Sequence, residues 1–241
     1  MPQLPDLFDP RYLDEVGYFL YQEEHSLETF GHPYDEERRA WSKKWLGQIL
    51  EFTGLDEAWL EDRTVVAIGS GCTGDLATWP ARTKIAVDPL LHTYQALGML
   101  LEDSPGTSPT IYLSVSAEDI PLNDGAADLI LCRNALDHMH RPDVALEEMW
   151  RIVADDGRLF FSVDIGGDPT PDEPTVFSEE SLREAVSVRF DIERVAQDRP
   201  HSANRELSVR MAATRKPDPR RTLDKRALLE AYTERNMRRR S

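Results

Sequence analysis

Short apolar runs alternate with stretches of helical periodicity through the middle of this chain. Runs rich in apolar and β-branched residues predict strands at Thr64–Ile68, Lys84–Val87, Ile111–Val115, Asp128–Cys132 and Arg158–Val163. Helical spacing of apolar residues predicts a short helix after Gly74, a longer one from Pro89 to Glu102, and the clearest one from Pro142 to Val153. Strands that alternate with helices in this way build a parallel sheet that is covered on both faces.

The last two predicted strands are neighbours in the sequence. A helix that starts at Ser178 and runs to about Val186 precedes them, and the strands themselves span Phe190 to Ala196 and Glu206 to Thr214. The loop between the two strands is too short for a crossover, so they must run antiparallel. The pattern therefore predicts an α/β fold with a doubly wound, mainly parallel sheet of seven strands, the last of which is antiparallel.

The first 60 residues are predicted to be helical. Two apolar stripes at helical spacing mark them: Leu13, Val16 and Leu20, then Trp41, Trp45, Ile49 and Phe52. Packing of both stripes on the sheet domain is one interpretation. The other is an aromatic lid over a ligand, made by Tyr18, Tyr21, Trp41 and Trp45. We expect three parts: a helical extension or lid (1–60), the sheet domain (61–216) and a basic tail (217–241).

Charge and composition exclude several classes of protein. The net charge is −16, although residues 215–241 carry ten Arg or Lys against four Asp or Glu, so the preceding part is more acidic still. Neutralising phosphates requires a basic face, so we expect no nucleic acid partner for the main domain. No apolar run is long enough for a membrane span, and residues 1–9 lack the features of a signal peptide. We expect a cytoplasmic protein with no membrane partner.

The cysteines and histidines show no metal-binding pattern. Cys72 and Cys132 each follow a predicted strand, which favours small buried residues over a disulfide or a metal pair. The six histidines have no ligand spacing with these cysteines. We therefore expect no metal.

A glycine-rich turn follows the first predicted strand. Gly69-Ser70-Gly71 is followed by Gly74, and the next strand ends on Asp88, 19 residues after Gly69. We expect Gly69 to permit a tight turn, Gly71 to let a ligand approach the backbone, and Gly74 to allow close helix packing. The Asp88 carboxylate, at the tip of the neighbouring strand, can accept both hydroxyls of a ribose. Together the turn and the acid predict a nucleotide-type ligand.

These motifs and the antiparallel ending resemble class I, Rossmann-like S-adenosylmethionine-dependent methyltransferases, and among them bacterial enzymes that act on small molecules. The resemblance spans about residues 40–214. It implies S-adenosyl-L-methionine as cofactor and in-line methyl transfer to a small-molecule acceptor. The block 67–71 is similar to the first motif, 117–122 to the loop beside the adenine, and 128–138 to the segment after the fourth strand. The cofactor-binding residues implied are Gly69, Ser70, Gly71, Gly74, Asp88, Pro89, Leu90, Ala117, Glu118, Asp119, Cys132, Arg133 and Asn134.

Three departures from the family pattern keep two alternatives open. Ala67 stands where the family often has an acid, Cys72-Thr73 widens the glycine turn, and Ser116 stands where an aspartate is frequent. The first alternative is a catalytically inactive methyltransferase-like binding module. The second is an NAD-dependent oxidoreductase, against which stand the antiparallel ending and the lack of a recognisable Tyr/Lys pair.

His138 is the first candidate for a general base, because it follows the fourth predicted strand at the catalytic edge of the sheet. Asp137 could orient the imidazole or bind substrate, and a structural hydrogen bond is the alternative role for His138. His140 and His201 are further candidates. The N-terminal helices and the loops 166–177 and 197–205 are expected to shape the acceptor pocket. The acidic composition favours a neutral or cationic acceptor over a phosphorylated one.

Overall fold

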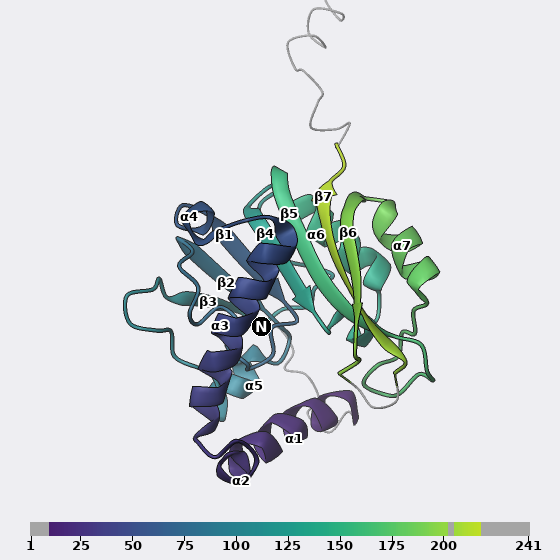
Figure 1. Cartoon of the computed structure of the whole chain (residues 1–241). Helices are drawn as coiled ribbons and strands as arrows, with labels where there is room; N and C mark the ends of the chain where they lie inside the picture. The colour runs from purple at the N-terminus through teal and green to yellow at the C-terminus, as the bar shows by residue number, and fades with distance from the viewer. Residues whose placement is uncertain (1–9, 202–204, 218–241) are drawn as a thin grey trace, which may run out of the picture.

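The computed structural model describes residues 10–201 and 205–217, and its centre is a seven-stranded sheet (Figure 1). In chain order the strands are β1 (Thr64–Ile68), β2 (Thr83–Val87), β3 (Thr110–Leu113), β4 (Ala127–Arg133), β5 (Val153–Ile165), β6 (Phe190–Asp198) and β7 (Leu207–Arg215). Their order across the sheet is β3-β2-β1-β4-β5-β7-β6. β7 pairs antiparallel with both β5 and β6, and the other pairs are parallel. The predicted fold class is confirmed.

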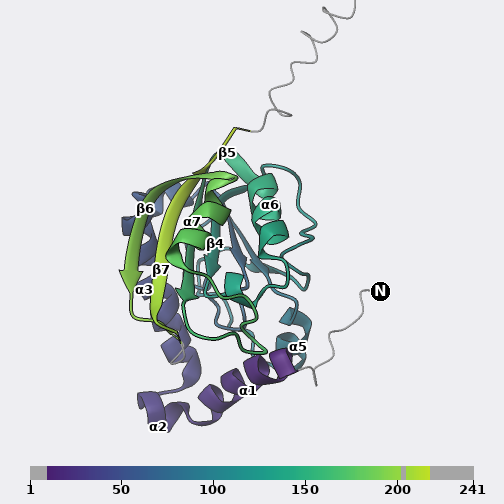
Figure 2. The same ribbon diagram turned by 90° about the vertical axis from the view of Figure 1, so that its right-hand side faces the viewer.

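Helices cover both faces of the sheet and one of its ends. They are α1 (Pro10–Glu24), α2 (Ser26–Phe30), α3 (Tyr34–Thr53), α4 (Glu57–Leu60), α5 (Leu91–Ala96), the 3-10 turn η1 (Leu136–His138), α6 (Pro142–Ile152) and α7 (Glu179–Ser187). Figure 2 shows α3 on one side of the sheet and α6 on the other, whereas α1 and α2 lie beyond the carboxyl ends of the parallel strands. The predicted helical character is confirmed for residues 10–60, as are the helices after Pro142 and Ser178, while residues 1–9 lie outside the described residues.

The side chains of β1 alternate between two hydrophobic cores. Val66 and Ile68 join the core that α6 and α7 cover, while Val65 and Ala67 join the core that α3 covers. This alternation follows from the two-residue period of a strand. Because β1 is buried on both faces and leads to the point where the strand order reverses, the loops after β1 and β4 meet at one edge of the sheet, where ligands of such folds bind.

Three predicted elements differ from the structure. The stretch after Gly74 forms turns instead of a short helix: its backbone hydrogen bonds join residues three apart, Ala77 to Gly74 and Trp79 to Leu76, and Pro80 follows. The helix predicted from Pro89 to Glu102 is reduced to α5 and is followed by Gly98 at φ 73°. β5 begins at Val153 instead of Arg158, with a register shift opposite Ala127 and Leu129.

The prediction that the first apolar stripe packs on the sheet domain was wrong in part. Leu13 and Leu20 are 52% and 42% exposed, and the buried apolar residue of α1 is Phe19. The second stripe does pack inward: Ile49 is buried, and Trp45 and Phe52 pack against the same core as β1.

Both cysteines are free and buried, as predicted. In the part of the chain that the structure describes, no helix combines the length and apolar character that a membrane span needs. The predicted basic tail lies almost entirely outside the described residues.

Candidate active site

The glycine turn after β1 is held tightly against the end of β4. Gly69 has φ 64°, and a Cβ on it would lie 2.3 Å from the Cβ of Ala135. Its N–H donates to the Val87 carbonyl at the end of β2 over 2.8 Å. A residue with a side chain would therefore meet both backbone strain and a steric clash. The turn brings the ends of β1, β2 and β4 together.

Asp88 ties this turn to the tip of β2. One carboxylate oxygen, Oδ2, accepts the Gly71 N–H at 3.0 Å, and the other, Oδ1, accepts the Leu90 N–H at 2.8 Å. Burial raises the pKa of Asp88, and these two donors act against that rise. A carboxylate oxygen has more than one acceptor position, so Asp88 can hold the turn and still accept hydrogen bonds from a ligand.

A cavity of about 830 Å³, counted with its open mouth, lies at this edge of the sheet. Its apolar wall includes Val87, Leu90, Ala117, Ala135 and Met139. The other lining residues are Tyr12, Glu15, Gly69, Asp88, Pro89, Ser116, Glu118, Asn134, His138, His140 and Asp172. The cavity is thus an apolar slot with polar groups at several points, which is the usual character of a small-ligand site.

Eight of the residues predicted from sequence line this cavity: Gly69, Asp88, Pro89, Leu90, Ala117, Glu118, Asn134 and His138. They come from four separate segments of the chain. Asn134 has a positive φ of 45°, so the backbone changes direction there and exposes this residue and Ala135 to the cavity. The ends of β1, β2 and β4 therefore meet at one cavity.

The other predicted residues lie outside the cavity. Ser70, Gly71 and Gly74 line a smaller pocket of about 300 Å³ behind the turn, where Gly74 packs against Leu101. Cys132 is buried in the core. Arg133 forms an ion pair with Asp75 and lies over the Trp45 ring, 3.9 Å from its centre. Asp119 and Asp137 are not among the lining residues.

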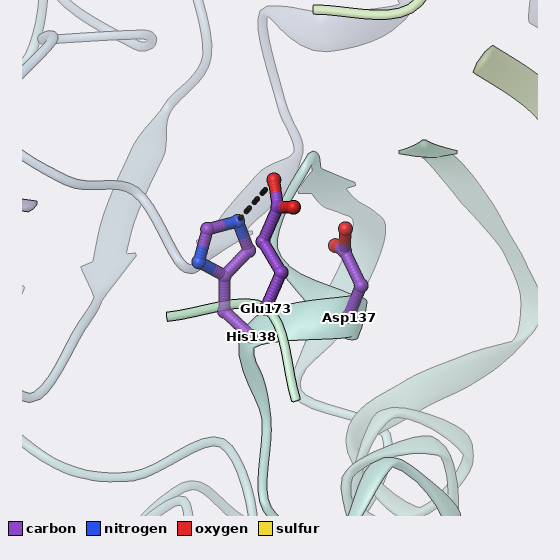
Figure 3. A group of neighbouring side chains, drawn as sticks. All are labelled: Asp137, His138 and Glu173. Carbon is purple, nitrogen blue, oxygen red and sulfur yellow. Dashed lines mark ion pairs between the residues drawn. The ribbon is translucent and has the colours of Figure 1, made fainter. Parts of the chain in front are cut away.

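Asp137, His138 and Glu173 form a group at one end of the cavity, shown in Figure 3. One ligand-type atom from each lies within 4.8 Å of the others, and His138 Nε2 is 4.0 Å from Glu173 Oε1. Asp137 has no exposed surface, and neither of its carboxylate oxygens has a hydrogen-bond partner among the described residues. Burial raises its pKa to about 6, with the nearby His138 acting against the rise.

Glu173 is held by a buried arginine. Arg205 Nε donates to Glu173 Oε2 at 2.9 Å, and Arg205 Nη2 donates to the Glu173 carbonyl at 3.1 Å. The residue comes from the 166–177 loop, which was expected to border the site. Among the further histidine candidates, His140 lines the cavity, whereas His201 faces Asp164 instead.

Two residues of α1, Tyr12 and Glu15, line the cavity, and no local motif marks them. Burial raises the pKa of Glu15 to about 7, and His138 opposes this rise. The four aromatic residues proposed as a lid do not line the cavity: Tyr18 and Tyr21 are more than half exposed, Trp41 packs on Tyr34, and Trp45 stacks with Arg133. A helix does cover the site, but through other side chains.

Comparison with known proteins relates the middle of the chain to a described family. Residues 66–161 match the model of a family described as a methyltransferase domain. A search among curated proteins finds no match.

Several solved structures share the fold. A possible histamine N-methyltransferase of Thermotoga maritima is 18% identical with a TM-score of 0.55, over 86% of this chain and 99% of that one. The 1,6-didemethyltoxoflavin-N1-methyltransferase of Burkholderia thailandensis, solved with S-adenosylhomocysteine, is also 18% identical, with a TM-score of 0.53 over 90% and 93% of the chains. A methyltransferase of Methanosarcina mazei is 14% identical, with a TM-score of 0.54 over 66% and 94%.

The family match covers the glycine turn, Asp88, the 117–122 loop and the segment with His138, which are the parts that build the cavity. The sheet order has the antiparallel β7 that the sequence resemblance implied. Residues 66–161 thus match a methyltransferase domain, and the chain shares the fold of these solved methyltransferases.

Proposed function

We propose that this chain is an S-adenosylmethionine-dependent methyltransferase and that it acts on a small, neutral or cationic acceptor that binds in the cavity beside His138. The observation that carries the proposal is the cavity itself, which joins Asp88 at the tip of β2 to His138 in η1. We further propose that residues 61–216 form the catalytic domain and residues 1–60 an extension that covers it. The free cysteines are in keeping with a cytoplasmic location.

The residues present fit the cofactor. Asp88 presents a buried carboxylate for ribose hydroxyls, Leu90 and Ala117 offer apolar surface for a flat ring, and Glu118 offers an acceptor at its edge. Asn134 and Ala135 border the part of the cavity nearer to His138. Ser70, Gly71, Gly74, Cys132 and Arg133 lie at the turn and the strand ends, where we propose that they hold the site in shape, and Asp119 lies outside the cavity. Bound S-adenosylmethionine supplies an electrophilic methyl group.

The charge of the cavity supports a neutral or cationic acceptor. Glu15, Asp88, Glu118 and Asp172 are carboxylates, and the lining residues of the described chain include no lysine or arginine. A phosphorylated acceptor would enter without a compensating cation, which is unfavourable in a partly desolvated site. The Thermotoga protein is a possible histamine N-methyltransferase and the Burkholderia protein methylates 1,6-didemethyltoxoflavin, which supports a small-molecule acceptor here.

We propose His138 as the general base for an acceptor that carries a proton. Figure 3 shows its Nε2 turned toward Glu173 and its Nδ1 on the opposite side of the ring. An Nε2–H facing Glu173 leaves Nδ1 free to accept a proton, and the imidazolium that forms would be stabilised by Glu173. Asp137 is fully buried, so it cannot touch substrate and its remaining role is to position His138.

The group of Asp137, His138 and Glu173 also has residue types that bind metals. Arg205 already neutralises Glu173 through a 2.9 Å hydrogen bond. We therefore propose that this group handles a proton and keep the prediction of no metal.

Calorimetric titration with S-adenosylhomocysteine, with NAD as control, is the first test. We expect S-adenosylhomocysteine to bind and NAD not to bind. In a second assay with S-adenosylmethionine as methyl donor, we expect S-adenosylhomocysteine to form with a panel of amines, imidazoles and phenols but not with phosphorylated analogues. Binding without turnover across the panel would favour an inactive binding module, and binding of NAD would favour an oxidoreductase.

A further inference from the structure

Glu15 reaches the cavity from α1, the helix that crosses the carboxyl ends of the strands (Figures 1 and 2). Phe19, one helical turn later, packs against the glycine turn: its ring lies 3.5 Å from the point where a Cβ on Gly71 would sit. Glu15 Oε1 lies 4.0 Å from the same point. Residues four apart share one face of a helix, so Phe19 seats α1 on the turn and directs Glu15 over it.

The surroundings of Glu15 are acidic. The charged groups that face it are His138, whose positive charge would favour its ionised form, and Asp88, Asp172 and Glu173, which oppose it. The lining residues of the described chain include no lysine or arginine that could neutralise this carboxylate. A partly buried carboxylate without a stable cation beside it is unfavourable, and a ligand cation would reduce that cost.

The cofactor carries the cation that this position lacks. S-adenosylmethionine has a sulfonium and, at the end of its methionine part, an ammonium; S-adenosylhomocysteine retains the ammonium alone, and 5′-methylthioadenosine has neither. β1 contains no acidic residue that could bind the ammonium, and its Ala67 is buried in the core on the α3 side. Glu15 lines the same cavity as Asp88, proposed for the ribose, and His138, proposed for the acceptor.

We propose that Glu15 binds the ammonium of the cofactor's methionine part, and that this contact holds α1 over the loaded site. The inference rests on the cofactor placement proposed above. It gives α1 a function beyond packing, since the helix contributes its carboxylate only while it lies against Gly71.

The test is calorimetric titration of wild type, Glu15→Gln, Asp14→Asn and Asp88→Ala with S-adenosylmethionine, S-adenosylhomocysteine and 5′-methylthioadenosine. Glu15→Gln is expected to weaken S-adenosylhomocysteine binding about tenfold and to leave 5′-methylthioadenosine binding within about twofold. Asp14→Asn removes a charge from an exposed position of the same helix and should change neither affinity. Asp88→Ala should weaken both ligands, because both contain the ribose.

Each other outcome overturns the assignment. If Glu15→Gln lost affinity equally for S-adenosylhomocysteine and 5′-methylthioadenosine, Glu15 would be a structural residue. The variant would then also unfold at a lower temperature than wild type. Loss with S-adenosylmethionine but not with S-adenosylhomocysteine would place Glu15 at the sulfonium. If Glu15→Gln bound S-adenosylmethionine, S-adenosylhomocysteine and 5′-methylthioadenosine as wild type does, Glu15 would not contact the cofactor and would be assigned to the acceptor instead. Failure of wild type to bind S-adenosylhomocysteine would instead contradict the proposed cofactor site.

Discussion

The Gly71 N–H donates to the Asp88 carboxylate over 3.0 Å, so the acid at the tip of β2 and the turn after β1 form one unit. Asp88 also accepts the Leu90 N–H and lines the cavity. Ligand binding and the local backbone structure therefore depend on the same side chain. A change at Asp88 alters the shape of the site as well as its hydrogen-bonding groups.

Asp88→Ala is expected to weaken S-adenosylhomocysteine binding at least tenfold, or about 1.4 kcal/mol, in calorimetry. The variant loses the ribose acceptor and frees the Gly71 and Leu90 N–H groups. Asp119→Ala is the matched control, because Asp119 belongs to the neighbouring loop but does not line the cavity. Unchanged affinity in Asp88→Ala would contradict the ribose assignment.

Gly69→Ala should destabilise the protein more than Gly98→Ala. Both glycines have positive φ, 64° and 73°, but only the Cβ at Gly69 would meet a neighbour, Ala135, at 2.3 Å. Backbone strain alone costs about 1 kcal/mol, and the clash should add about 1–3 kcal/mol at Gly69. Urea denaturation of the two variants measures the difference. Equal losses would mean that the turn can move away from Ala135.

His138→Ala should lower turnover by about 10²–10⁴-fold while S-adenosylhomocysteine affinity stays within twofold, if the acceptor must lose a proton. Glu173→Gln should lower turnover less and shift the pH profile, since it changes the group that faces Nε2. His92→Ala is the control, because His92 is exposed and outside the cavity. Loss of cofactor binding in His138→Ala would make His138 a structural residue.

In the ligand-free protein, Glu15→Gln should reduce the loss of folding stability that accompanies a rise in pH. Burial raises the pKa of Glu15 from 4.5 to about 7, so the folded state binds this proton more tightly than the unfolded chain. The resulting stabilisation is present below about pH 4.5 and is lost as the pH rises through 7. His138, Asp88, Asp172 and Glu173, which face Glu15, remain in the variant.

Between pH 5 and pH 8 the free energy of unfolding of Glu15→Gln should therefore rise by about 1–3 kcal/mol relative to wild type. Denaturant titrations at the two pH values measure it. Saturating S-adenosylhomocysteine should reduce the difference at pH 8, because the ligand's ammonium then offsets the wild-type charge. A constant difference at both pH values would show that the Glu15 carboxyl is not desolvated in the ligand-free state.

The parts of this protein that its sequence determines are those with local causes. The apolar runs at β1, β2 and β4 required buried strands, and the short loop before β7 required an antiparallel partner. In a doubly wound sheet the strand ends meet at one edge, so Gly69, Asp88 and His138 could be placed in one site before the structure was known. The helix predicted after Gly74 is absent for a local reason too, since the stretch forms three-residue turns and meets Pro80 within six residues.

Only the tertiary structure decided which neighbours of these residues face the cavity. Arg133 turns to Asp75 and Trp45 on the α3 side, while the positive φ of Asn134 directs the next residues into the site. Glu15 and Glu173 lie far along the chain from the glycine turn, and no spacing links them to it. Their positions depend on Phe19 packing against Gly71 and on Arg205 holding Glu173, which are long-range contacts that a local pattern does not encode.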